Sequence, residues 1–463
     1  MRQADKYAAF DTETGLIYNI IKLRHRQNRA FAQGNHICGY LRIGGGELRD
    51  YKTFALEIRG KGNLVPKVTK ICLCGIEANF VRYYMIYRQF KDKKLSALGF
   101  GCMRLPTRNG VYADIDEEYA EKMLDTAMAN GVNYYDTAWG YHDGNSETAV
   151  GKILSKYPRE SFYLASKFPG YDLNNMGKAE EIFETQLKKC RVEYFDFYLI
   201  HNVCEKNIDA YLDDEKYGTV SYLLKQKQNG RIKHLGFSGH GEYGVMQRFL
   251  EKYGKYMEFG QLQVNYLDWT FQGAKQKVEL FKSYNIPVWV MEPLRGGKIA
   301  SLAPEYEAQL KALRPDEGIP AWAFRFLQSL PDVTVILSGM SDMAQVEDNL
   351  NTFKTDKPLN KEEMTALLGI ADSIIKSNAL PCTACRYCTA HCPKELSIPE
   401  IIKLYNEHCS SRDGFIAPMV FDTYAEEKLP SACVGCRSCE KVCPQNIKIS
   451  EMMKDFSRRL GRN

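Results

Sequence analysis

The sequence has no run of eighteen or more apolar residues, and its first twenty residues lack the apolar centre of a signal peptide. We therefore expect no membrane span and a cytoplasmic location. No G-x-G-x-x-G run follows a strand-like segment, so the phosphate loop of a doubly wound dinucleotide-binding fold is missing. No basic stripe interleaved with aromatic residues is present either, and nucleic acid is not an expected partner.

The net charge of +5 does not contradict that expectation, because the basic excess is confined to one part of the chain. Residues 1–84 carry 14 Lys and Arg against 7 Asp and Glu, which leaves 48 basic and 50 acidic residues in the other 379 positions. The overall composition, with 44% hydrophobic and 26% charged residues, is typical of a globular protein.

Cysteine, by contrast, is abundant and unevenly distributed. Of fifteen cysteines, eight lie in two copies of the run C-x2-C-x2-C-x3-C-P, from Cys382 to Pro393 and from Cys433 to Pro444. In a cytosolic protein such clustering favours metal binding over disulfides. Two zinc sites of four thiolates each are the alternative, but this run, twice and each time ending in C-P, favours two 4Fe–4S clusters.

The ligand sets follow from the bacterial two-cluster pattern, in which the fourth cysteine of each run binds the other cluster. The pattern predicts one cluster on Cys382, Cys385, Cys388 and Cys443, and a second on Cys433, Cys436, Cys439 and Cys392. We interpret Cys409 and His391 as packing residues.

From about residue 95 to about residue 350, short β-branched or aromatic runs alternate with helical ones. Eight such units in about 255 residues favour a (β/α)8 TIM barrel over a doubly wound sheet. One helix is expected to start after Asp116, a suitable N-cap that is followed by Glu117 and Glu118. We predict a barrel over residues 85–376 and a small, mostly helical dicluster ferredoxin domain over 377–463. Residues 1–84 match no pattern, and we expect them to be an extension outside the functional fold.

Four polar side chains stand at the ends of three consecutive predicted strands. Asp136 ends VNYYD, Tyr141 follows in its loop, Lys167 ends FYLASK and His201 ends FDFYLIH. The carboxyl ends of the strands carry the active site in this fold, so these four residues are candidate catalytic groups.

These residues and the segments around them resemble the aldo/keto reductase family. The resemblance covers about residues 85–355 and includes, in order, LGFGCMRL, DTAWGY, GNSE, ASKF, LIHN, GFSGH, QVNYLD and MEPLRGG. Together with the cysteine runs, the chain is similar to a microbial branch of that family fused to a ferredoxin module.

The resemblance implies an NAD(P)H-dependent reductase of aldehydes or ketones. Tyr141 would donate the proton, Lys167 would lower the pKa of Tyr141, Asp136 would hold Lys167, and His201 would orient the carbonyl. Nicotinamide contacts are expected from Ser166, Asn202 and Gln263. Pyrophosphate and adenosine contacts are expected from the loops after the last two strands, at Pro293, Leu294, Gly296, Gly297, Ser338, Gly339, Gln345 and Asn349.

The sequence departs from the family's pattern at the residues that would contact the coenzyme's 2′-phosphate. Gly339 and Gln345 stand where many members have a Lys and an Arg that clamp this group, so NADH is expected to be accepted as well as NADPH. The expected partners are a small carbonyl substrate and an electron partner, either a ferredoxin or a flavoprotein. The alternative function is an electron-transfer or partner-binding iron–sulfur protein with a catalytically weak barrel.

Overall fold

The computed structural model describes residues 85–382, 384–410 and 416–461, together with four strands before them. These four strands pair as two antiparallel hairpins, β1 (Asp5–Asp11) with β2 (Leu16–Lys22) and β3 (Lys70–Leu73) with β4 (Ile76–Asn79). Otherwise residues 1–84 lie outside the described residues, so the prediction that they stand apart from the functional fold remains a prediction.

Eight parallel strands close into a barrel, as the sequence predicted. Neighbouring strands follow one another in the chain, and the last strand pairs with the first. The strands are β7 (Leu98–Gly101), β8 (Tyr134–Asp136), β9 (Tyr163–Phe168), β10 (Phe195–Val203), β11 (Ile232–Gly239), β12 (Gly260–Gln263), β13 (Val288–Met291) and β14 (Val333–Gly339).

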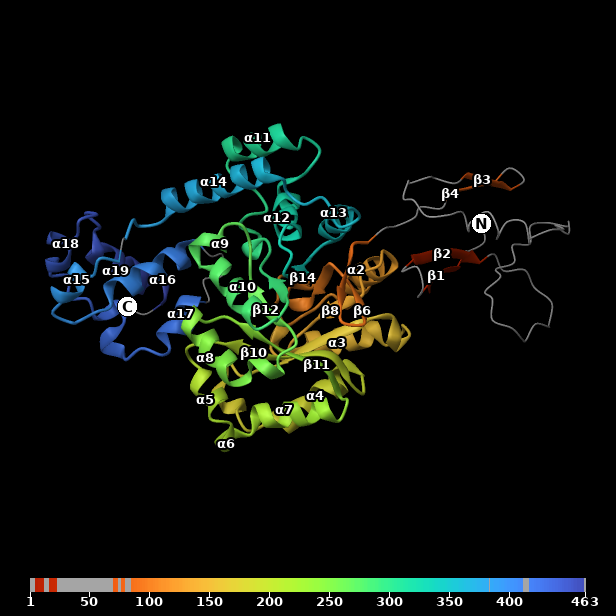
Figure 1. Ribbon diagram of the computed structural model, residues 1–463, viewed down its shortest axis with the longest axis horizontal. Helices are drawn as coiled ribbons and strands as arrows, with labels where there is room; N and C mark the ends of the chain where they lie inside the picture. The colour runs from red at the N-terminus through yellow and green to blue at the C-terminus, as the bar shows by residue number, and fades with distance from the viewer. Residues whose placement is uncertain are drawn as a thin grey trace. The chain divides into compact units, whose positions relative to one another are not determined.

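Helices follow each strand and surround the barrel (Figure 1). The first, α2, begins where it was predicted to: the Asp116 carboxylate accepts a hydrogen bond from the Tyr119 amide at 3.1 Å and caps the helix. The helices between and after the strands are α2 (Glu117–Ala129), α3 (Ser146–Leu154), α4 (Ala179–Cys190), α5 (Ile208–Leu212), α6 (Asp214–Tyr217), α7 (Thr219–Gln228), α8 (Tyr243–Tyr253), α9 (Asp268–Phe271), α10 (Ala274–Ser283), α11 (Pro304–Leu313), α12 (Ile319–Gln328), α13 (Met343–Thr352) and α14 (Lys361–Asn378).

A hairpin covers the amino-terminal end of the barrel, the end opposite the candidate site. It consists of β5 (Tyr87–Phe90) and β6 (Lys93–Ser96). The buried ring of Phe90 packs edge-on against Trp289, with 5.0 Å between ring centroids, and at a tilt against Phe197, with 5.6 Å between centroids. The barrel is therefore sealed at this end by apolar side chains from the hairpin and from five of the barrel strands.

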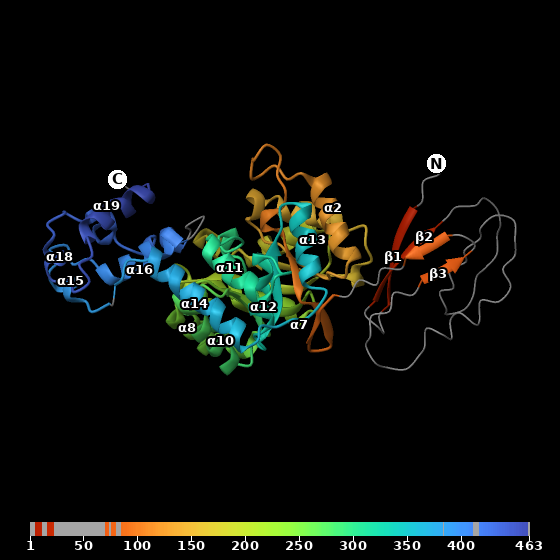
Figure 2. The same cartoon turned by 90° about the horizontal axis from the view of Figure 1, so that it is seen from above.

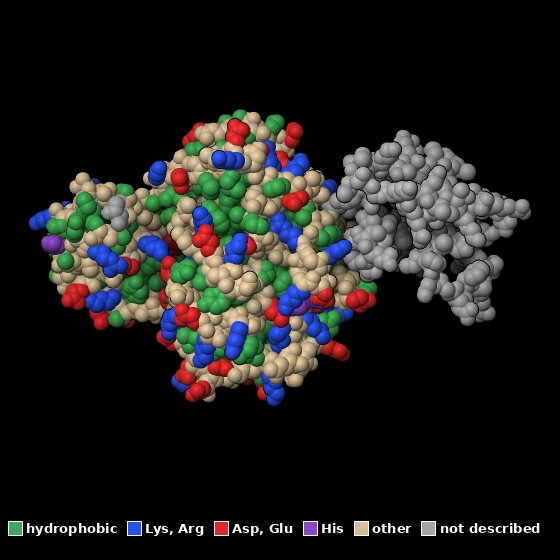
Figure 3. Space-filling view, viewed as in Figure 1, with side chains coloured by type: hydrophobic (Ala, Val, Ile, Leu, Met, Phe, Trp, Pro, Cys, Tyr) green, Lys and Arg blue, Asp and Glu red, His purple; other side chains and the backbone are tan. Residues whose placement is uncertain are grey.

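The cysteine-rich part is mostly helical (Figure 2) and has a core of its own. Its helices are α15 (Tyr387–Ala390), α16 (Ile398–Ser410), α17 (Ile416–Phe421), α18 (Ser438–Lys441) and α19 (Ile449–Arg459). Apart from Met128–Gly131, the barrel and the cysteine-rich part belong to one compact unit. Charged side chains of both signs are interspersed over the visible face of this unit (Figure 3). Among the described helices, none combines the length and apolar character needed to cross a bilayer.

Candidate active site and cluster sites

The four candidate catalytic residues converge at the carboxyl end of the barrel. The Lys167 ammonium donates to the Asp136 carboxylate at 2.5 Å, to the Thr137 carbonyl at 2.8 Å and to the Tyr141 hydroxyl at 3.3 Å. The Tyr141 and His201 rings lie 6.2 Å apart, edge to face. Strands β8, β9 and β10 are neighbours in the barrel, which is why residues 65 positions apart in sequence meet here.

Burial governs the protonation of this group. Lys167 is fully buried; burial alone would lower its pKa, but Asp136 and Tyr141 outweigh it and the net pKa is raised. Burial raises the pKa of Asp136, and Lys167 opposes that rise. Lys167 lowers the pKa of Tyr141, as the sequence predicted, but burial has the larger effect and the pKa of Tyr141 is raised overall. Tyr141 is therefore a protonated phenol at neutral pH.

His201 is held as a neutral imidazole. Burial, and then the Lys167 charge, keep its pKa well below the ordinary value of 6.5. Its Nδ1 is buried and has no hydrogen-bond partner in the described part of the chain. A second histidine, His240 at the end of β11, lies 6.0 Å from it ring to ring, with a pKa lowered by burial to about 3. The sequence reasoning did not single out His240.

The loop that carries Tyr141 is fixed by its neighbour His142. His142 is buried, accepts from the Leu105 amide at 3.1 Å and contacts the Tyr112 carbonyl at 2.7 Å. Its backbone φ of 53° lies in the left-handed region, as does that of Asp143. Such strained turns persist only where surrounding contacts hold them, and here they aim Tyr141 at Lys167.

Ser166 does not join the candidate nicotinamide contacts. Consecutive residues of a strand face opposite sides, so Lys167 and Ser166 cannot both point into the barrel mouth. The Ser166 hydroxyl donates to Glu147 of α3 at 2.6 Å, and Gln186 of α4 donates to the same two side chains. The geometry therefore does not support a nicotinamide contact by Ser166, and it reveals a buried polar network behind Lys167 that the sequence reasoning missed.

Asn202 and Gln263 are placed where a ligand could use them. The Asn202 side-chain oxygen is buried without a partner among the described residues. Gln263 lines a cavity at the barrel mouth with Gly239, His240, Gln272, Lys277 and Met291. Asn202 is not among the residues that line this cavity, and the Gln263 side-chain nitrogen already donates to Asp268 at 2.9 Å, so both remain predicted nicotinamide contacts.

The two loops that are predicted to bind pyrophosphate and adenosine differ in backbone conformation and in the hydrogen bonds of their side chains. Pro293, Leu294, Gly296 and Gly297 flank Arg295, and both glycines have positive φ, at 62° and 89°. After β14, Asn349 donates to the Ser338 hydroxyl at 3.0 Å. The Gln345 amide is engaged with Asp342 at 2.8 Å and with the Ser341 backbone at 2.9 Å. Gly339 is exposed, and the Arg104 side chain lies against it.

The two cysteine runs fold alike. The residues on either side of the second cysteine have positive φ in both runs: Ala384 and Arg386 at 54° and 63°, Gly435 and Arg437 at 65° and 60°. The two runs therefore share the same left-handed backbone turn on both sides of their second cysteine.

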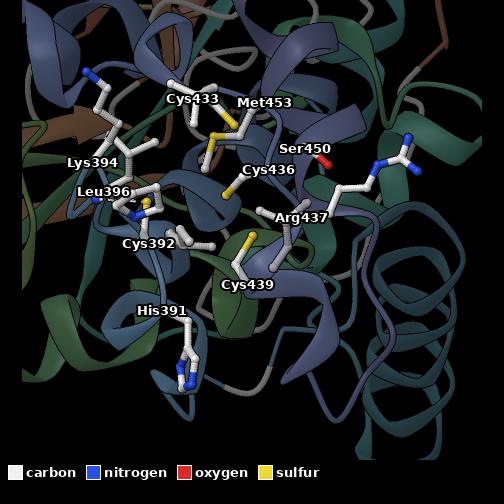
Figure 4. Close-up of a pocket in the computed structure, with 14 residues that line it drawn as sticks. His391, Cys392, Lys394, Leu396, Cys433, Cys436, Arg437, Cys439, Ser450 and Met453 are labelled. Atoms are coloured by element: carbon white, nitrogen blue, oxygen red, sulfur yellow. Dashed lines mark hydrogen bonds between the residues drawn. The ribbon is translucent and has the colours of Figure 1, made fainter.

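Cysteines distant in sequence approach one another in the predicted pairing. Cys392, Cys433, Cys436 and Cys439 line one cavity, and Figure 4 shows these four side chains around it. The pKa of Cys382 is raised by burial and then by the nearby thiols of Cys385 and Cys443. No three ligand-type residues in the described ranges meet closely enough to hold a single ion.

Comparison with known proteins agrees with these two parts. The model of the aldo/keto reductase family matches residues 97–372, more than half of the chain, and that of a 4Fe–4S dicluster domain matches residues 381–448. A probable aldo-keto reductase of Glycine max is 35% identical over 154 residues, which cover 31% of this chain and 42% of that protein. The NADH-specific methylglyoxal reductase of Escherichia coli is 25% identical over 327 residues, covering 60% of this chain and 97% of that protein.

Solved structures agree on the barrel. The holo form of an aldo-keto reductase from Bacillus halodurans is 25% identical with a TM-score of 0.50, covering 62% of this chain and 96% of that one. An aldo-keto reductase from Klebsiella pneumoniae in complex with NADPH has the same fold at 18% identity and a TM-score of 0.50, covering 63% of this chain and 96% of that one. With its closed barrel and a family match over more than half of its length, this chain belongs to the aldo/keto reductase family and carries a 4Fe–4S dicluster domain.

Proposed function

We propose that this protein is an NAD(P)H-dependent reductase of small aldehydes or ketones, with Tyr141 as the proton donor. The contact that carries the proposal is the buried Tyr141–Lys167–Asp136 array, with 3.3 Å from hydroxyl to ammonium and 2.5 Å from ammonium to carboxylate. When bound, the reduced nicotinamide supplies the hydride that the carbonyl carbon accepts.

The residues of this chain would move and hold the proton. The Tyr141 hydroxyl gives its proton to the carbonyl oxygen, and the Lys167 ammonium stabilises the phenolate that remains. Asp136 keeps Lys167 charged and in place. Neutral His201 can donate one ring hydrogen to the same carbonyl oxygen and so orient the substrate. The raised pKa of Tyr141 keeps the phenol protonated until a substrate oxygen arrives.

We further propose that the C-terminal domain holds two 4Fe–4S clusters, with each run lending its fourth cysteine to the other site. One ligand set is supported by the cavity that Cys392 lines together with Cys433, Cys436 and Cys439. The other is supported by the nearby Cys443 thiol, which contributes to raising the pKa of Cys382. When bound, such clusters supply one-electron transfer. Hydride transfer moves two electrons at once, so the proposed carbonyl reduction needs neither cluster.

Tyr141→Phe tests the catalytic proposal in the purified holo-protein. The phenyl ring keeps the shape of the site but has no proton to give, so carbonyl-dependent oxidation of NADH or NADPH should fall at least about 100-fold. The cluster absorbance should be unchanged, because Tyr141 lies in the barrel. Retained turnover in this variant would remove Tyr141 from the proton-donor role.

A further inference from the structure

We propose that the cluster domain positions the nicotinamide site through a buried chain of polar contacts that runs from Glu407 to Gln263. The inference rests on the proposed NAD(P)H-dependent function. Glu407 belongs to α16 of the cluster domain, and Gln263 ends strand β12 of the barrel. The two residues are 144 positions apart in sequence.

The chain begins at Gln263. Its side-chain nitrogen donates to the Asp268 carboxylate at 2.9 Å. A carboxylate can only accept, so this contact decides which way the Gln263 amide points. The amide oxygen is left as an acceptor at the cavity that Gln263 lines, and the NH2 group of a nicotinamide carboxamide is a donor that fits it.

Asp268 is in turn held by Arg295. Asp268 is fully buried, and the Arg295 Nε lies 3.0 Å from both of its carboxylate oxygens. Arg295 is also buried, at 3% exposure, and its φ of 49° lies in the left-handed region. It stands between Leu294 and Gly296 in the loop expected to bind pyrophosphate. The position of Arg295 therefore bears on both the loop and the Gln263 amide.

The cluster domain supplies Glu407, the last residue in this chain of polar contacts. The Arg295 Nη2 lies 3.7 Å from Glu407, and Gln272 of the barrel donates to the same Glu407 oxygen at 3.2 Å. The Glu407 side chain is buried, so water screens these contacts little. Ile416 of α17 lines the same cavity as Gln263 and Gln272, so the cluster domain also contributes to the wall of the barrel's mouth.

Glu407 is thus a positioning residue for the coenzyme, and its effect should appear in binding. In Glu407→Gln, Arg295 keeps Asp268 but loses its second carboxylate. We expect KM and Kd for NADH to rise about tenfold, within the range typical of coupling between sites, while kcat at saturating NADH changes less than about twofold. Iron content and cluster absorbance should match the wild type.

Lys403→Ala is the matched control. Lys403 lies one turn earlier on α16 and also reaches the barrel, where it pairs with Glu242 at 2.9 Å, but both side chains are more than half exposed. Removing an exposed ion pair should leave the KM for NADH unchanged. The inference is overturned if Glu407→Gln binds NADH like the wild type, or if kcat and cluster absorbance fall while Kd stays constant.

If Glu407→Gln does not fold, a measurement on the wild type can test the coupling between Glu407 and the NADH site. Coupling is reciprocal, so NADH bound at the barrel should slow amide hydrogen exchange in α16 around Glu407. Unchanged exchange in α16 with NADH bound would refute the coupling. A wild-type protein that binds neither NADH nor NADPH would instead refute the proposed function, so the two failures are distinguishable.

Discussion

At the scale of single residues, the barrel mouth is built from charged groups that water cannot reach. Lys167 is fully buried and Asp136 nearly so, and each stabilises the charge of the other. Removing one partner of such a pair leaves an uncompensated buried charge, which typically costs about 3–5 kcal/mol. This interdependence explains why Tyr141→Phe, which leaves the pair intact, is a cleaner probe of chemistry than a change at Lys167 or Asp136.

The protonation states of the site predict a flat pH profile around neutrality. His201 stays neutral because its pKa lies well below 6.5, and Tyr141 stays protonated because its pKa lies above 10. With a carbonyl substrate that does not ionise, kcat/KM for reduction should vary less than about twofold between pH 6 and 9. A limb centred near pH 6.5 would contradict this assignment.

The lowered pKa of His201 also makes the stability of the fold depend on pH. The unfolded chain binds a proton at His201 below about pH 6.5, whereas the folded chain does so only at lower pH. The contribution of neutral His201 to stability is therefore present above about pH 6.5 and is lost as the pH falls.

We expect the preference for NADH or NADPH to depend on a few residues after β14. The Gln345 amide is occupied by Asp342 and Ser341, and the Asp342 carboxylate would repel a 2′-phosphate. We predict that kcat/KM with NADH equals or exceeds that with NADPH.

A preference for NADPH above about a hundredfold, roughly 2.7 kcal/mol, would show that another cation binds the 2′-phosphate. Arg104, whose side chain lies against Gly339, is the first residue to test in that case. Arg104→Ala should then remove the preference.

At the scale of elements, the β5–β6 hairpin closes the amino-terminal end of the barrel. Its Phe90 ring contacts Phe197, Trp289 and His234, with ring centroids 5.0–5.6 Å apart. We predict that Phe90→Ala lowers the free energy of unfolding by about 3–5 kcal/mol, the usual cost of emptying such a site. Denaturant unfolding monitored by circular dichroism measures it.

Asp92→Ala, at the exposed turn of the same hairpin, serves as the control, and its effect should stay within about 0.5 kcal/mol. Equal effects of the two substitutions would mean that the hairpin does not seal the core. The carboxyl end of the barrel, where the candidate site lies, should keep its geometry in both variants.

At the scale of the whole molecule, the two halves touch, yet the proposed chemistry of the barrel requires no cluster. We predict that anaerobically purified wild-type protein contains about eight irons, as two 4Fe–4S clusters require. Cys385→Ser should lose iron and part of the cluster absorbance but retain carbonyl turnover at saturating NADH. Any weakening of NADH binding would follow from the contact at Glu407.

Cys409→Ser provides the control, since Cys409 lies outside both cysteine runs and should leave the iron content unchanged. If Cys385→Ser keeps a normally folded barrel but loses all turnover, the two halves form one obligatory redox chain. Iron-free wild-type protein after anaerobic reconstitution would refute the cluster assignment.

Much of this protein could be inferred from sequence because the relevant signals are local. Cluster ligands depend on spacing within a dozen residues, strand and helix alternation depends on side-chain periodicity, and strand-end positions predict which side chains meet at a barrel mouth. The Asp116 cap, the eight strands and the meeting of Asp136, Tyr141, Lys167 and His201 were accessible in this way.

Tertiary structure alone decided the contacts between segments that no local pattern relates. Ser166 faces Glu147 and Gln186 because strand alternation turns it away from the mouth once Lys167 points inward. The pKa of Tyr141 is raised because burial outweighs the neighbouring charge, and burial is a property of the folded barrel. Asp268, Arg295 and Glu407 meet only because the cluster domain packs on the barrel. Spacing within the chain carries no information about such a meeting, since its energy comes from charges brought together in a dry interior.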